Sequence, residues 1–131
     1  MNSIVYFEIQ SSCLEREANF YRNVFGWNIT KDEAVSIPYY RIETDGIRGA
    51  LMERPAAVVP MSGTNAFTCS IEVAHFDETA GIILANGGKI ALPKFAIPGK
   101  CWEGYFLDPD QNVFGIFEVI TCCSPAPEKQ K

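Results

Sequence analysis

The stretch DPDQNVFGIFE at residues 108–118 indicates a tight turn followed by a strand. Pro109 has the φ angle that the second position of a turn requires, and the Asp and Asn side chains beside it can hydrogen-bond to the local backbone. From Val113 onward the residues are mostly β-branched and aromatic, which predicts a strand up to Ile120. A glycine inside a strand, here Gly115, often marks a place where another group approaches the backbone closely. We therefore expect a group to lie against the sheet at Gly115.

The composition is that of one globular domain. The chain has 131 residues, 47% of them hydrophobic, and a formal net charge of −5. The basic residues are scattered and give no support for nucleic-acid binding. No apolar run reaches the roughly 20 residues of a membrane helix, and the first residues lack the basic and apolar regions of a secretory signal. We expect a cytoplasmic protein that binds neither nucleic acid nor membranes. The five cysteines predict neither a disulfide framework nor a zinc site.

The order of predicted elements repeats once along the chain. Each half begins with an alternating strand, continues with a helix that stops at a glycine, and ends with about three further strands. The first helix is predicted to begin with a capping box formed by Ser12 and Glu15 and to end at Gly26. The second helix is predicted to end at residues 86–88. The predicted strands cover residues 5–10, 27–30, 34–38, 39–43, 47–53, 67–73, 89–92, 101–107 and 113–120, with a loop at 93–99.

This repeat predicts an α+β fold made of two modules. Neither half alone could bury its sheet, so the two halves are expected to pair into one curved mixed sheet around a cleft, with the helices outside. Module one covers residues 1–54, a linker 55–64, and module two 65–123, so that residues 1–123 form a single domain. Residues 124–131 are expected to form a flexible tail.

Three segments of the chain resemble a known family. They are FYRNVFGW at residues 20–27, NGGK at 86–89 and DPDQNVFG at 108–115. Together they resemble the vicinal oxygen chelate superfamily of glyoxalase I, bleomycin-resistance proteins and extradiol dioxygenases, over residues 4–120. The resemblance implies two βαβββ modules, a sheet curved round a cleft, and usually a homodimer.

The same resemblance implies where metal ligands would stand. Metal-dependent members hold a divalent ion in the cleft on His and Glu side chains from both modules. In this chain those positions fall on residues that are neither His nor acidic, namely Tyr6, Thr68, Gly115 and either Gly49 or Ala50. Such an ion needs three or four donors of the imidazole, carboxylate or thiolate kind. We therefore expect a divergent member without the usual metal ligands, and no metal or other cofactor.

Carboxylates are the remaining candidates for chemistry. The single histidine, His75, lies at the predicted start of the second helix and is expected to be exposed or to cap it. Glu8 and Glu72 fall on the cleft-facing sides of equivalent strands. A carboxyl group shielded from water takes up protons more readily and can act as an acid or base, so Glu8 is the candidate catalytic residue. A metal site built from Glu8, Glu72 and Glu103 stays open as an alternative.

The other candidate residues are expected to bind a ligand. A small-molecule site combines apolar walls with a few polar anchors, and Gly115 would leave room beside them. The candidate ligand-binding residues are Tyr6, Gln10, Leu51, Thr68, Ser70, Glu72, Trp102, Gly115 and Phe117. Trp102 and Phe117 have an alternative interpretation as core or dimer-interface residues.

The sequence thus predicts a metal-free homodimer that binds a small organic molecule in its cleft. Two alternatives remain. One is an enzyme, either a lyase or isomerase of the glyoxalase type or a dioxygenase-like protein, with a non-standard metal site or an acid–base site. The other is a non-catalytic structural or regulatory module.

Overall fold

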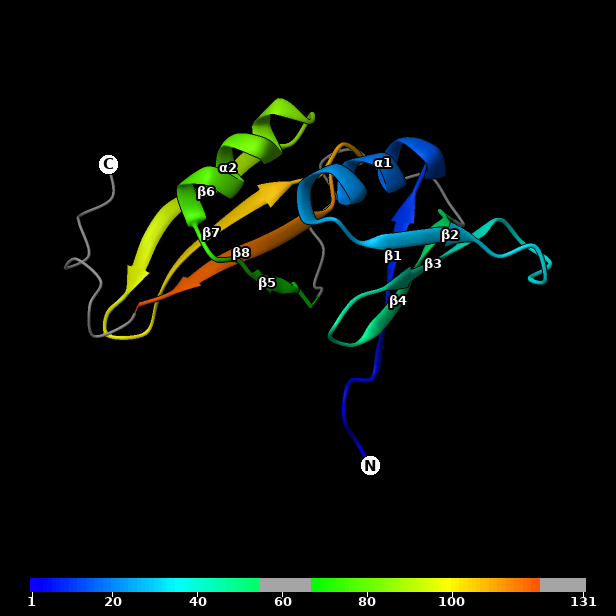
Figure 1. Ribbon diagram of the computed structural model, residues 1–131, viewed down its shortest axis with the longest axis horizontal. Helices are drawn as coiled ribbons and strands as arrows, with labels where there is room; N and C mark the ends of the chain where they lie inside the picture. Colours follow the sequence, from blue (N-terminus) through cyan, green and yellow to red (C-terminus); the bar gives the residue numbers. More distant parts are fainter. Residues whose placement is uncertain (55–66, 121–131) are drawn as a thin grey trace. The chain divides into compact units, whose positions relative to one another are not determined.

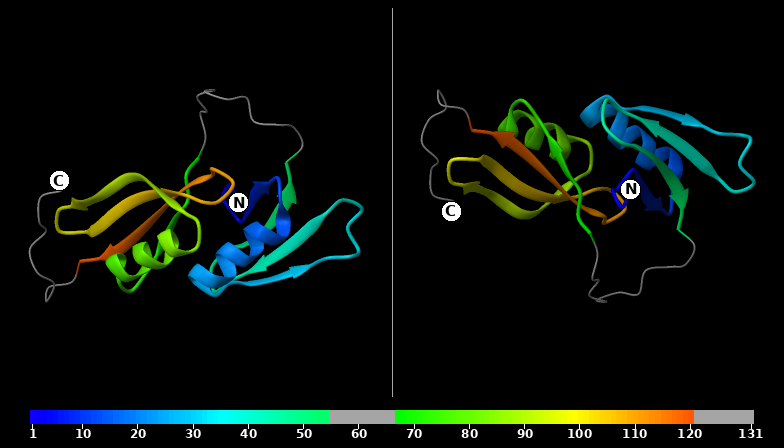
Figure 2. Two further views of the ribbon diagram at one scale, coloured as in Figure 1. Left: turned by 90° about the horizontal axis from the view of Figure 1, so that it is seen from above. Right: turned by 90° about the horizontal axis from the view of Figure 1, so that it is seen from below.

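The computed structural model describes residues 1–54 and 67–120. The chain divides into two compact units, Met1–Thr64 and Asn65–Lys131, and each unit contains one strand, one helix and then three strands (Figures 1 and 2). The predicted fold class, an α+β protein of two βαβββ modules, is confirmed. Each module forms its own four-stranded mixed sheet, where one continuous sheet had been predicted. The predicted linker at 55–64 and the tail at 124–131 lie outside the described residues.

The first unit consists of β1 (Tyr6–Ser11), α1 (Leu14–Phe25), β2 (Asn28–Lys31), β3 (Tyr39–Glu43) and β4 (Arg48–Glu53). Its sheet has the order β1-β4-β3-β2, with β1 parallel to β4 and the other pairs antiparallel. A parallel pair needs a long crossover, which α1, β2 and β3 supply here. The helix lies over one face of this sheet (Figure 1).

The core of the first unit lies between α1 and the sheet. Ala18 and Tyr21 of the helix are 0% and 2% exposed, and the Tyr21 ring stacks on Trp27 with centroids 5.0 Å apart. The helix ends as predicted at Gly26, which has a φ of 69°, and its N–H donates to the Arg22 carbonyl. This left-handed conformation is one that glycine adopts without a steric penalty. The stop directs the chain back across the sheet into β2.

Two details of the first unit differ from the prediction. The predicted capping box of Ser12 and Glu15 is wrong, since the helix is capped by Cys13 without a side-chain hydrogen bond. The Glu15 carboxylate instead accepts a hydrogen bond from Tyr40 in β3. This long-range contact replaces the predicted local contact with Ser12. The strand predicted at residues 34–38 is a connection, and the Ala34 N–H donates to Asp32 Oδ1 at its start.

The second unit consists of β5 (Ser70–Glu72), α2 (Phe76–Ala85), β6 (Lys89–Ile97), β7 (Cys101–Leu107) and β8 (Val113–Val119). Its sheet has the equivalent order β5-β8-β7-β6, with β5 parallel to β8. β5 is shorter than the predicted strand, whereas β6 continues through most of the predicted loop. Pro93 is tolerated there because β6 is an edge strand whose pairing is irregular between Leu92 and Phe95.

The turn before β8 is held by one buried carboxylate. Asp108 is 1% exposed, and its Oδ1 accepts hydrogen bonds from the N–H groups of Asp110 (2.8 Å) and Asn112 (2.9 Å). Its Oδ2 accepts a third from Asn112 Nδ2 at 3.1 Å. Gln111 closes the turn with a φ of 69°. The predicted turn and strand are thus confirmed, and they bring Gly115 to the third position of β8.

Helix α2 is anchored to its sheet by Phe76 and Glu118. The Phe76 ring, 3% exposed, lies so close to Gly104 of β7 that a Cβ atom at position 104 would be 2.6 Å from the ring. The Phe76 N–H donates to Glu118 Oε1 at 2.7 Å. A strand carboxylate therefore caps the first turn of α2. Neither helix in the described residues is long and apolar enough to cross a membrane.

Replacing Glu118 by alanine should destabilise the protein by about 1–2 kcal/mol, because the Phe76 N–H at the start of α2 loses its acceptor. Chemical denaturation of wild type and variant gives this difference in free energy of unfolding. Glu118→Gln is the matched control, since it keeps an acceptor oxygen and should retain most of the stability. Equal losses in both variants would show that the charge matters and the cap does not.

Candidate functional site

One face of the second sheet gathers most of the candidate residues of module two. Because Phe76 of α2 packs on Gly104 and Phe106, the alternate residues of β7, Glu103 and Tyr105, point to the opposite face. Strand pairing puts two rows of side chains on that opposite face. We call it the Glu103 face; one row is Ser70, Gly115, Tyr105 and Leu92, and the next is Glu72, Phe117, Glu103 and Phe95.

Gly115 lies in the middle of the Glu103 face and has no room for a side chain. A Cβ atom at position 115 would lie 2.7 Å from Glu103 Oε2 and 3.0 Å from Tyr105 Cε1, and nearer still to Ser70 Oγ. The Ser70 hydroxyl donates to Glu103 Oε2 at 3.0 Å. The expectation that a group approaches the sheet at Gly115 is confirmed, and that group is the Ser70–Glu103 pair. The space is taken up by these side chains, where we had expected it to serve a ligand directly.

The first sheet carries a second polar cluster, on the face of β1 to which Tyr6 and Glu8 both belong. Tyr6 donates a hydrogen bond to Glu8 Oε2 at 2.9 Å, and its oxygen lies 2.7 Å from the Tyr39 hydroxyl. Partial burial, followed by these two hydrogen bonds, raises the pKa of Tyr6 above its ordinary value of 10. The phenol therefore stays protonated at neutral pH and orients the Glu8 carboxylate. On β3 of the same sheet, Arg41 Nε lies 3.6 Å from Asp32 Oδ2.

Two further candidates are exposed side chains at or near the first strand of each module. Gln10 is exposed and follows Glu8 on the same face of β1. Thr68 is exposed and lies before the start of β5. Glu72 and Phe117, in contrast, are direct neighbours across β5 and β8 on the Glu103 face.

Leu51 and Trp102, two of the expected ligand-site walls, lie on the helix-covered faces of their sheets, away from the Glu8 side of β1 and from the Glu103 face. Leu51 is 0% exposed and pairs with Tyr40, whose hydroxyl reaches Glu15 of α1. Trp102 is 9% exposed, with Lys94 Nζ 4.4 Å from its ring centroid. Lys94 Nζ also lies over Phe76 of α2. Both side chains belong to the core, which was the alternative interpretation of Trp102.

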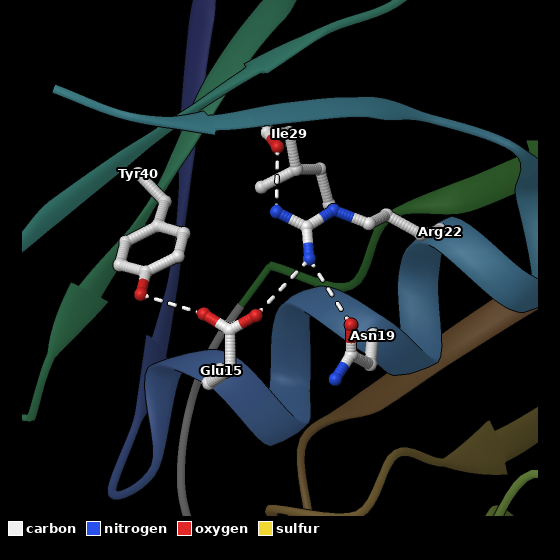
Figure 3. Close-up of polar contacts among 5 residues, drawn as sticks. All are labelled: Glu15, Asn19, Arg22, Ile29 and Tyr40. Carbon is white, nitrogen blue, oxygen red and sulfur yellow. Dashed lines mark hydrogen bonds and ion pairs between the residues drawn. The ribbon is translucent and has the colours of Figure 1, made fainter.

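A third carboxylate, Glu15, ties the first helix to its sheet (Figure 3). It accepts hydrogen bonds from Tyr40 at 2.8 Å and from Arg22 at 3.4 Å, and Arg22 also donates to the Ile29 carbonyl and to Asn19. The Tyr40 hydrogen bond, with the Arg22 guanidinium beside it, lowers the pKa of Glu15. This network connects α1 to β2 and β3, and we assign it a structural role.

The lowered pKa of Glu15 predicts how stability depends on pH. Because the pKa of Glu15 is lower in the folded protein than its ordinary value of 4.5, the ionised carboxylate stabilises the protein fully at pH values above 4.5. This stabilisation is lost as the pH falls through the pKa of the folded state. Glu15→Gln should therefore lower stability at pH 7 by about 0.5 kcal/mol, a small effect because the side chain is 62% exposed. The difference between wild type and variant in thermal denaturation should shrink between about pH 5 and pH 3. A constant difference over that range would contradict the assignment.

The residues at the expected metal-ligand positions do not fit a divalent ion. Gly115 and Ala50 offer no side-chain donor, Thr68 offers a hydroxyl, and the raised pKa of Tyr6 disfavours the phenolate that would bind a metal. Within residues 1–54 and 67–120, no three His, Cys, Asp or Glu side chains are placed to share an ion. We therefore assign no metal-dependent reaction to these positions.

The comparisons with known proteins agree with this fold. Among solved structures, the chain is similar to a glyoxalase/bleomycin resistance protein/dioxygenase family enzyme from Burkholderia phytofirmans PsJN, with a TM-score of 0.72, 20% identity, and coverage of 88% of this chain and 98% of that one. It is also similar to the genomically encoded fosfomycin resistance protein FosX from Listeria monocytogenes, with a TM-score of 0.71, 15% identity, and coverage of 88% and 90%. A glyoxalase-related enzyme from Fulvimarina pelagi matches with a TM-score of 0.68, 20% identity, and coverage of 99% and 100%.

At these identities the structural matches show the fold and not the activity. No curated protein sequence matches the chain. The family model described as Glyoxalase/Bleomycin resistance protein/Dioxygenase superfamily matches residues 3–116, nearly the whole of the described chain. The protein therefore belongs to the Glyoxalase/Bleomycin resistance protein/Dioxygenase superfamily.

Proposed function

We propose that this protein binds a small organic molecule without the help of a metal ion. The observation that carries the proposal is the state of position 115, where the family resemblance puts a metal ligand. The chain has a glycine there, and the Ser70–Glu103 pair fills the space. A carboxylate and a hydroxyl beside aromatic rings form a site that recognises a ligand by hydrogen bonds and apolar contact.

We also propose that the protein is a cytoplasmic homodimer. Exposed Ile90 and Leu92 lie on the edge strand β6, and a second chain would remove such side chains from water. Light scattering coupled to size exclusion should give twice the 14.6 kDa of one chain. A mass of one chain at micromolar concentration would refute the dimer.

The experiment for the binding proposal is a thermal-melt screen of a small-molecule library against the protein, run both without a chelator and, after metal stripping, with one. A ligand that binds only the native state raises the melting temperature by mass action. At a concentration 100 times its Kd, it increases the free energy of unfolding by about 2.7 kcal/mol. We expect at least one compound to give a saturable rise that the chelator leaves unchanged. If every rise disappears with the chelator, the metal-free proposal fails.

The Tyr6–Glu8 hydrogen bond favours a second candidate, an enzyme that uses Glu8 as a general acid or base. The donated hydrogen bond of 2.9 Å holds the carboxylate in one orientation, which acid–base catalysis requires. For any substrate found to be turned over, Glu8→Gln should reduce kcat by about 100-fold or more and leave the melting temperature unchanged. Unchanged turnover in that variant would exclude Glu8 as the catalytic group.

A further inference from the structure

The Glu103 side chain is largely buried. Its residue is 7% exposed, and within residues 1–54 and 67–120 its hydrogen bond comes from Ser70 Oγ. A carboxylate has about four acceptor sites, so one hydroxyl leaves most of this capacity open. Burying a charged group is costly unless a partner compensates it. A donor from outside the chain would compensate it.

Lys94, a cation on the neighbouring strand β6, does not serve as that partner. Lys94 precedes Phe95 on β6, but its side chain extends to the helix-covered face of the sheet. There its Nζ lies 3.1 Å from Asp77 Oδ1 and 4.4 Å from the centroid of the Trp102 ring. Because alternate strand residues point to opposite faces, the Glu103 face has the carboxylate and the helix-covered face has the ammonium group.

Aromatic rings surround Glu103 on its own face. Phe95 and Phe117 are its direct cross-strand neighbours on β6 and β8. Tyr105 follows two residues later, with its ring 6.3 Å from that of Phe95. The face of an aromatic ring attracts a cation, and more strongly where water is excluded. Glu72 lies beyond Phe117 in the same row, so a second carboxylate stands two strand spacings, about 10 Å, from the first.

We propose that Glu103, with Phe95, Phe117 and Tyr105, binds the cationic nitrogen of an organic ligand, an ammonium, amidinium or guanidinium group. Ser70 positions the carboxylate through Oε2 and leaves Oε1 to accept from the ligand. Gly115 is required because a side chain there would displace both partners of that hydrogen bond. This inference rests on the proposed small-molecule binding and specifies the chemical class of the ligand.

The test uses three probes of one shape, benzylammonium, benzyl alcohol and benzoate, titrated into the full chain by NMR. We expect benzylammonium to bind at least 10-fold more tightly than benzyl alcohol, and benzoate to show no saturable binding. Glu103→Gln keeps the size of the side chain and an acceptor for Ser70, and should remove the preference for the cation. Glu78→Gln, which removes an exposed charge from α2, is the matched control and should preserve that preference.

The outcomes separate this inference from the proposed function. If benzyl alcohol or benzoate binds as tightly as benzylammonium, or if Glu103→Gln keeps the preference, the cation site is refuted while small-molecule binding stands. If no probe binds and the library screen yields only neutral or anionic ligands, the cation site is refuted alone. If the library also yields nothing, both fail. Should Glu103→Gln not fold, the ranking of the three probes on the wild-type protein still decides.

Discussion

Replacing Gly115 by glutamate should destabilise the protein by about 3 kcal/mol or more, and should not create a metal site. The new side chain would collide with Ser70 and Tyr105 and would put a second carboxylate against Glu103. Overpacking alone costs about 1–3 kcal/mol, and the lost Ser70–Glu103 hydrogen bond adds about 1–2 kcal/mol. Chemical denaturation measures the loss in free energy of unfolding. The substitution supplies the acid that the family resemblance implies at this position, so it tests whether the rest of the site can accept an ion.

Gly115→Ala is the control for this prediction. A methyl group at position 115 would meet Ser70 Oγ and Glu103 Oε2. Both atoms belong to side chains that can move, so we expect a smaller loss in free energy of unfolding, about 1–2 kcal/mol. A Gly115→Glu protein as stable as the wild type, or one that gains stability with a divalent ion, would contradict the description of Gly115 as a filled position.

Replacing Asp108 by alanine should cost about 3 kcal/mol. The variant removes the acceptor of three hydrogen bonds from Asp110 and Asn112, each worth about 1 kcal/mol. The turn would loosen where it enters β8, and amide hydrogen exchange of that strand should accelerate. Urea denaturation gives the magnitude.

The control for Asp108 is Asp45→Ala, which removes an exposed carboxylate from the turn between β3 and β4. It should change the free energy of unfolding by less than about 0.5 kcal/mol. Equal effects of the two substitutions would show that the loss follows from removing negative charge from a turn.

The parts of the fold that depend on local chemistry could be predicted from the sequence. The left-handed stop at Gly26 and the Asp-Pro turn before β8 need particular residue types, so their residues are diagnostic. The capping box failed although its residue types were right, since Glu15 finds a stronger partner in Tyr40, 25 residues away. The Glu118 cap was missed for the same reason, because its partner Phe76 is 42 residues distant.

How clearly a strand's two faces differ in sequence decides which residues of the site could be predicted. β5 alternates clearly, and strand pairing puts Ser70 and Glu72 on one face with Phe117. β7 reads CWEGYFL, with large apolar residues on both faces, so periodicity alone cannot decide whether Trp102 or Glu103 points toward the helix. The contact of Gly104 with Phe76 decides it. The sequence therefore predicts for Glu103, the buried acid of this face, only a place in the alternative carboxylate metal site.

The most direct test of the metal-free account is a thermal melt of metal-stripped protein with and without Mg, Mn, Fe, Co, Ni and Zn. An ion that binds the native state raises the melting temperature in a saturable way. Because positions 6, 50, 68 and 115 carry Tyr, Ala, Thr and Gly, we predict no saturable rise with any ion. A saturable rise with one ion that Glu8→Gln or Glu72→Gln abolishes would contradict the account and show a carboxylate metal site in its place.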